Sequence, residues 1–138
     1  MAARRASVHE RGCCVRLDFH GTSVRVAREQ LRSELRGDVP AASVEDARMV
    51  VSELVANSLR YARPLAGHTI AVEWQVGLDG LRLSVTDGGS RTSLPCRRRP
   101  GELATGGRGL RIVESLARRW GVESEDTGTT VWAELDVR

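Results

Sequence analysis

Two neighbouring stretches of alternating apolar and polar residues constrain the fold of this chain more than any other feature. In HTIAVEWQV, residues 68–76, the side chains of Ile70, Val72 and Trp74 share one face of a strand. GLDG follows as a turn, and LRLSVTD, residues 81–87, alternates in the same way. A hairpin with one apolar face needs a covering layer. The pattern therefore predicts an antiparallel sheet whose apolar face packs against helices.

Two amphipathic helices are expected to supply that layer. The first can be capped by Thr22 or Ser23 and is expected to run to about Arg36, where a glycine ends it. The second begins with Ser43 as its cap. It runs to about Arg63, because the proline that follows cannot continue a helix.

The rest of the chain completes the pattern. CVRLDFH, residues 14–20, alternates and is expected to form a strand, whereas GGRGLRIVESLARRWGV, residues 106–122, is expected to be helical. Its apolar side carries Leu110, Val113, Leu116, Ala117 and Trp120. VESED and GTTVWAELDVR then form a second hairpin. The sum is an α+β two-layer sandwich, with a mixed, mostly antiparallel sheet and helices on one face.

Composition narrows the class of protein. The chain has 138 residues, 41% of them hydrophobic, which suits one globular domain. No apolar run approaches the roughly 20 residues of a membrane helix, and the first residues lack a secretory signal, so we expect a cytoplasmic protein. The net charge is only +3 and no nucleic-acid-reading motif is present. The three cysteines and three histidines do not have a metal-binding spacing.

Several polar residues stand on or beside apolar faces. Glu53 and Asn57, four apart in SELVANSLRYA, flank the buried arc of the long helix. Asp87 and Thr129 continue the inward parity of their strands. Each of these residues can also be explained without a function. Glu53 and Asn57 could be hydrated boundary positions, Asp87 a turn aspartate, and Thr129 a threonine that favours the strand conformation.

A glycine-rich loop opens the last helix. TGGRGL, residues 105–110, would expose free backbone N–H groups at the positive end of the helix dipole, although a flexible hinge has the same composition. A purine nucleotide would use all of these features in their order along the chain. Asp87 could accept from the adenine amino group, Asn57 could bind Mg²⁺, and the glycine loop could hold phosphates.

The chain resembles the GHKL (histidine kinase-like) ATPase superfamily on four quoted segments. ELVANSLRYA resembles its N-box, VTDGGS its first glycine box, GGRGLRIVESLARRWGV its second, and GTTVWAEL its terminal strand. Within the superfamily the chain resembles the anti-sigma-factor serine kinases and their single-domain actinomycete relatives. The resemblance implies a Bergerat ATP-binding fold over residues 13–138, with a disordered basic stretch at 1–12 and a lid at about 90–106.

The resemblance also implies roles for individual residues. Glu53 would be the general base and Asn57 the Mg²⁺ ligand. Asp87 would contact adenine, with Thr129 supporting it through water; Thr130 is a rival, but strand parity favours Thr129. The remaining implied nucleotide contacts are Gly89 beside the base, and Gly107, Arg108, Gly109 and Leu110 at the phosphates.

One position departs from the family pattern. The first glycine box usually reads Asp-x-Gly-x-Gly, and Arg91 occupies its last place. The arginine could crowd the nucleotide or reach a phosphate. Three further arginines in the lid, residues 97–99, could seek phosphate, but such a cluster is more often a solvated surface.

These features lead to two functional hypotheses. The first is a Mg-ATP-dependent serine protein kinase that phosphorylates a STAS-type anti-sigma-factor antagonist, and can sequester a sigma factor or form a homodimer. The second is a binding module without catalysis that acts by gripping a regulator. A DNA-binding role lacks a reading element.

Overall fold

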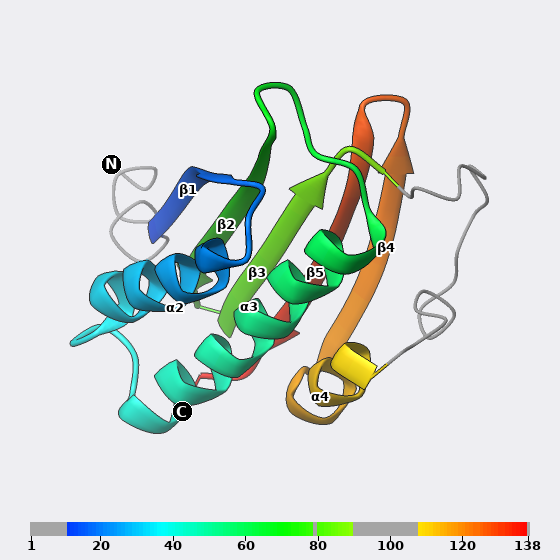
Figure 1. The fold of residues 1–138 in the computed structure, drawn as a ribbon. Coiled ribbons are helices and arrows are strands. Elements are labelled where there is room, and N and C mark those ends of the chain that lie inside the picture. The colour runs from blue at the N-terminus through cyan, green and yellow to red at the C-terminus, as the bar shows by residue number, and fades with distance from the viewer. Residues whose placement is uncertain (1–10, 79, 90–107, 138) are drawn as a thin grey trace, which may run out of the picture.

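The computed structural model describes residues 11–78, 80–89 and 108–137, and Figure 1 shows their arrangement. The elements follow the chain in this order: β1 (Arg11–Asp18), α2 (Thr22–Leu35), α3 (Ala41–Tyr61), β2 (Thr69–Gly77), β3 (Gly80–Asp87), α4 (Arg108–Leu116), β4 (Arg119–Glu125) and β5 (Gly128–Leu135). Among these residues, no helix is long and apolar enough to cross a membrane.

The strands form one five-stranded sheet in the order β1-β2-β3-β5-β4, and every neighbouring pair is antiparallel. Helices α2, α3 and α4 lie over one face of this sheet, with α3 running across its middle (Figure 1). The predicted two-layer α+β architecture and both predicted hairpins are thus confirmed, whereas the sheet expected to be mixed has only antiparallel pairs among the described strands. The β3–β5 ladder joins strands that are not consecutive, and it sets Asp87 directly opposite Thr129.

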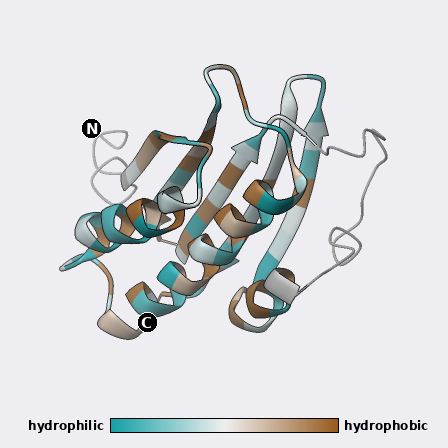
Figure 2. Cartoon of the chain, in the orientation of Figure 1, coloured by the Kyte–Doolittle hydropathy of each residue, from teal (hydrophilic) through white to brown (hydrophobic). Residues whose placement is uncertain are grey.

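The core fills the space between the sheet and the helices. Figure 2 shows hydrophobic residues alternating with hydrophilic ones along α3 and the central strands. Trp74 is the largest fully buried side chain, and it is surrounded by valines, leucines and alanines of both layers. Each buried leucine or valine side chain stabilises the fold by about 1.5–3 kcal/mol relative to its exposed state. The alternating strand residues and the apolar arc of α3 are therefore the main source of stability.

The helices begin earlier than the expected caps. Gly21 precedes α2 and Pro40 precedes α3, and neither helix has a side-chain cap. Ser23 instead donates to the carbonyl oxygen of Asp18 at 2.5 Å. Ser43 is a buried residue inside the first turn of α3. The predicted cap of α3 is wrong, because Pro40, with φ −55° and ψ 148°, is the residue that precedes the first helical residue, Ala41.

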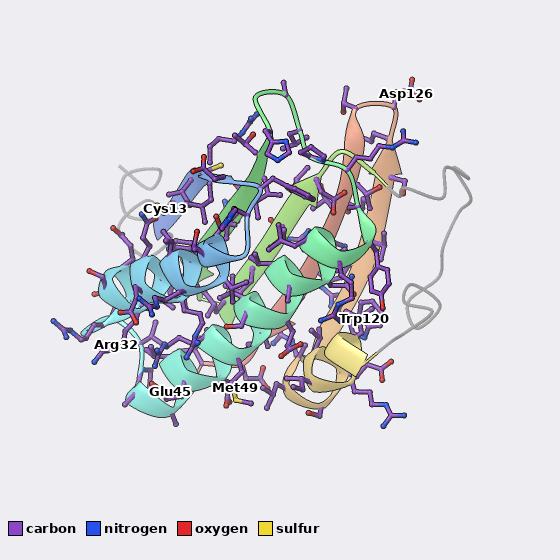
Figure 3. The ribbon with its side chains drawn as sticks, viewed as in Figure 1. Cys13, Arg32, Glu45, Met49, Trp120 and Asp126 are labelled. Atoms are coloured by element: carbon purple, nitrogen blue, oxygen red, sulfur yellow. The ribbon has the colours of Figure 1, made fainter. Side chains whose placement is uncertain are left out.

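The last helix is shorter than its sequence pattern predicts. It ends at Leu116, and Trp120 lies in β4 rather than on the helix. Figure 3 shows Trp120 on the sheet beside α4, and Asp126 at the turn joining β4 to β5. The spacing of Leu116, Ala117 and Trp120 fits a helix locally. Pairing with β5 prevails because it satisfies a whole row of backbone groups from Arg119 onward.

Candidate functional site

Asp87 is a buried carboxylate at the end of a central strand. It is only 4% exposed, on the inner face of β3 as strand parity predicts. The Ser58 hydroxyl on α3 donates to Oδ2 at 2.6 Å, and the Gly89 N–H donates to Oδ1 at 2.8 Å. Each carboxylate oxygen therefore accepts one hydrogen bond, and the group is fixed between the helix layer and the sheet.

The environment of Asp87 opposes its charge. Desolvation by burial raises the pKa of Asp87 above its usual range, and the hydrogen bonds from Ser58 and Gly89 partly offset this by stabilising the ionised form. A buried carboxylate without a cationic partner costs stability. A buried carboxylate with a shifted pKa is a candidate for function, because such groups cluster at functional sites.

Close backbone approaches lock the segment that follows Asp87. The Gly88 N–H donates to the Arg63 carbonyl at 2.7 Å, and the Arg63 N–H donates to the Gly89 carbonyl at 2.8 Å. A Cβ on Gly88 would collide with the Pro64 carbonyl oxygen. Gly89 has a φ of +102°, a conformation that side-chain-bearing residues rarely adopt. Gly88 and Gly89 are thus required because their backbone packs closely against Arg63 and Pro64, which follow α3. This requirement does not depend on any ligand.

Thr129 faces the same side as Asp87. The two residues are Cα partners in the β3–β5 ladder, and a Cβ on Gly89 would lie 3.9 Å from the Thr129 hydroxyl oxygen. The hydroxyl lies 3.4 Å from that of Ser124 on β4. Thr130 points to the opposite face, where its hydroxyl is 2.7 Å from that of Thr86. Strand parity therefore selects Thr129 over Thr130 as the residue beside Asp87.

Glu53 and Asn57 lie along the flank of α3. Asn57 is 9% exposed and immediately precedes Ser58, so it belongs to the helical turn that holds Asp87. Glu53 lies one turn earlier and is half-buried. Glu53 is a boundary residue of the apolar arc, as predicted from the sequence, whereas Asn57 is buried. Asn57 is thus the helix neighbour of the serine that contacts Asp87, and Glu53 precedes it by four residues on the same helix.

The start of α4 holds some of the residues that are predicted to contact phosphates. Arg108 and Gly109 open the helix, and α4 packs against α3. The side chain of Leu110 is 4% exposed and belongs to the core, so only its backbone is available to a ligand. Gly107, Arg91 and the arginines at 97–99, together with the predicted lid, lie outside the described residues.

Asn57 is chemically suited to a magnesium ion. Its side chain offers an amide oxygen, and Mg²⁺ in nucleotide sites typically takes one or two protein oxygens, with phosphates and water completing the shell. Within the described ranges, no group of three or more His, Cys, Asp or Glu side chains could hold a metal. The amide of Asn57 therefore fits a Mg²⁺ ion whose other ligands are phosphate and water oxygens.

Ser58 is the site residue that sequence reasoning missed. A hydroxyl at the centre of an apolar arc was the available signal, since a buried polar group needs a partner. Ser124, close to Thr129, gave no such signal because it stands on an edge strand and is exposed.

The fold is a two-layer α+β sandwich with a buried carboxylate at the end of a central strand of its sheet. The family model of the histidine kinase-like ATPase domain matches residues 19–135, and the chain belongs to this family. No curated protein matches the chain significantly.

A solved structure shares the fold. It is the crystal structure of the RsbU and RsbW domains of Rv1364c from Mycobacterium tuberculosis, at 23% sequence identity and a TM-score of 0.68. The match covers 92% of this chain and 32% of that one, so the chain spans about a third of the length of that protein. This likeness supports the fold alone.

Proposed function

We propose that this chain binds Mg-ATP and acts as a serine protein kinase of the anti-sigma-factor type. The observation that carries the proposal is the buried carboxylate of Asp87, held by two donors and set opposite Thr129. A fixed acceptor of this kind suits the amino group of adenine. The family match supports ATP as the ligand, and the printed name of the RsbW domain supports the regulatory class.

The chain's own residues would divide the work. Asp87 and Thr129 orient the base, and Gly89 allows it close approach. Asn57 would hold Mg²⁺, which supplies charge neutralisation at the phosphates. The backbone at Gly107, Arg108, Gly109 and Leu110 would face the phosphates at the positive end of the α4 dipole.

Glu53 would act as the general base. It takes the proton from the hydroxyl of a partner's serine, whose oxygen forms a bond to the γ-phosphorus as the bond to the β,γ-bridging oxygen breaks. ADP leaves, and the partner carries the phosphate. Phosphoryl transfer depends mainly on positioning and charge, so a half-buried carboxylate on a rigid helix suits this role.

The partner would be a small STAS-type antagonist of an anti-sigma factor, in the cytoplasm. A sigma factor would be the second partner, held while the antagonist is phosphorylated, and homodimer formation accompanies this class. Transfer of labelled γ-phosphate from ATP to a serine of such an antagonist tests the proposal. Label appearing on that serine supports it, and tight ATP binding without any transfer contradicts it.

The second candidate is a binding module without catalysis. The arginine at position 91, in place of a glycine of the first glycine box, favours it. In that case the chain grips its regulator with or without nucleotide. The transfer assay separates the two, because only a kinase consumes ATP in proportion to the phosphorylated partner.

A further inference from the structure

Ser58 and Asp87 form a direct bond between α3 and β3. The two side chains are 3% and 4% exposed, and the hydroxyl donates to the carboxylate at 2.6 Å. Ser58 stands in the middle of the apolar face of α3, between buried Leu54 and Val55 on one side and Ala62 on the other. A hydroxyl in that place costs stability unless it is bonded.

A second serine in the same helix shows what the hydroxyl would otherwise do. Ser52 donates to the Arg48 carbonyl one turn earlier, at 2.7 Å, which is the usual bond of a serine inside a helix. Ser58 is bonded to Asp87 instead. Its hydroxyl therefore connects the helix to the site.

The two donors restrict what Asp87 can offer a ligand. The Gly89 N–H is a backbone donor and cannot reverse, so Oδ1 must accept. Ser58 holds Oδ2 in a fixed place, and the lone pairs that remain also accept. No cationic side chain of the described residues is among the causes of the shifted pKa of this carboxyl. The Asp87 carboxylate is thus a hydrogen-bond acceptor, and the bond from Ser58 sets its orientation.

We propose that Ser58 is a positioning residue that sets the base selectivity of this site, by fixing Asp87 as an acceptor for an exocyclic amino group. This inference rests on the proposed ATP binding. A 6-amino purine presents a donor to the carboxylate, whereas a 6-oxo purine presents an acceptor and is rejected. Discrimination of this kind is strong because a mismatched polar group is left unpaired in a buried site.

The experiment compares Mg-ATP with Mg-ITP, which carries a 6-oxo group in place of the amino group. Dissociation constants are measured by calorimetry for the full chain and for Ser58→Ala, Ser58→Thr and Ser52→Ala. We expect Ser58→Ala to lower the ATP-over-ITP preference by about tenfold, the value of one hydrogen bond to a charged group. Ser58→Thr keeps the hydroxyl and restores the preference, and Ser52→Ala leaves it unchanged.

The outcomes are distinguishable. If Ser58→Ala weakens both nucleotides equally, or leaves their ratio unaltered, Ser58 is only a packing residue and the inference is wrong. If the unmodified chain binds neither nucleotide, the proposed function itself fails and the inference falls with it. Thermal unfolding of each variant confirms that the comparison is made between folded proteins.

Discussion

Asp87 and Thr129 stand directly opposite each other across the β3–β5 ladder, and both face the helix layer. The ladder joins two strands that are separated by α4 and β4 in the chain. It therefore combines a carboxylate from the first glycine box with a hydroxyl from the terminal strand. The neighbouring residue Thr130 faces away, which provides an internal control.

Thr129→Val should weaken Mg-ATP binding by about fivefold to tenfold, since a hydroxyl in a ligand site contributes on the order of 1 kcal/mol. Thr130→Val removes the hydroxyl bonded to Thr86 on the other face, and should leave the nucleotide affinity unchanged. Calorimetric titration of both variants checks this. Equal losses from the two substitutions would show that the parity assignment does not describe the ligand site.

The stability of the fold should depend on pH through Asp87. Burial raises the pKa of Asp87 above its usual range, so the folded chain holds this proton to higher pH than the unfolded chain does. The contribution of Asp87 to the stability of the fold is thus fully present below the pKa that this carboxyl has in the unfolded chain. It is lost as pH rises through the pKa that the carboxyl has in the folded chain. Asp87→Asn should remove this loss and leave the fold at neutral pH more stable by about 1 kcal/mol.

Urea unfolding from pH 4 to 8 measures this effect. The difference in unfolding free energy between Asp87→Asn and the unmodified chain should grow with pH. A difference that instead falls as pH rises would mean that the ionised carboxylate stabilises the fold, which is the opposite of the expected effect.

Glu134 should contribute stability of the opposite pH dependence. The pKa of Glu134 lies below its usual range, first because of the hydrogen bonds from Arg119, with Arg82 adding to the effect against an opposing desolvation. The contribution of Glu134 to stability is present above the pKa that this carboxyl has in the unfolded chain. It is lost as pH falls through the pKa of the carboxyl in the folded chain. Glu134→Gln should destabilise the fold by about 1 kcal/mol at neutral pH, and less at high salt.

Glu123 provides the matched control for that substitution. It stands on the same side of the sheet in β4, opposite Thr130, and it is exposed. Glu123→Gln should leave the unfolding free energy within about 0.5 kcal/mol of the original. If the two variants unfold alike, the arginine cluster around Glu134 is not a stabilising network.

Glu53→Ala should separate binding from chemistry. Glu53 is half-buried on the flank of α3 and is expected to act on the partner's hydroxyl rather than on the base, so ATP affinity should change less than about threefold. Phosphoryl transfer to a partner serine should fall by at least about 100-fold, the usual contribution of a general base. Glu45→Ala, an exposed glutamate near the start of the same helix, should leave transfer intact. Loss of ATP affinity in Glu53→Ala would place this residue in binding instead.

Much of this fold can be predicted from residue patterns because strand periodicity is strict. Asp87 and Thr129 were placed on the inner face by parity alone, and the structure confirms this for both. The two hairpins follow from alternation interrupted by short turns. Alternation and turn residues are local features of the sequence, and the tertiary structure keeps the strands and turns that they predict.

Other features depend on contacts between distant segments and could not be predicted. The bond between Ser58 and Asp87 exists only once α3 lies on β3. Trp120 fits the helix pattern before it, and only the free edge of β5 draws it into a strand. The starts of α2 and α3 were wrong because several residues in a row can precede a helix equally well.

The most direct test of the proposed adenine site is calorimetric titration of Mg-ATP into the unmodified chain and into Asp87→Asn. In this variant the Gly89 N–H should bind the side-chain oxygen of the asparagine, which then occupies the place of Oδ1. The NH₂ group of the asparagine would occupy the place of Oδ2 and would present donors, instead of an acceptor, to the adenine amino group. We predict saturable binding to the unmodified chain and an affinity at least about 100-fold lower for the folded variant. Equal affinity of the two proteins for Mg-ATP would contradict the assignment of Asp87 to the adenine base.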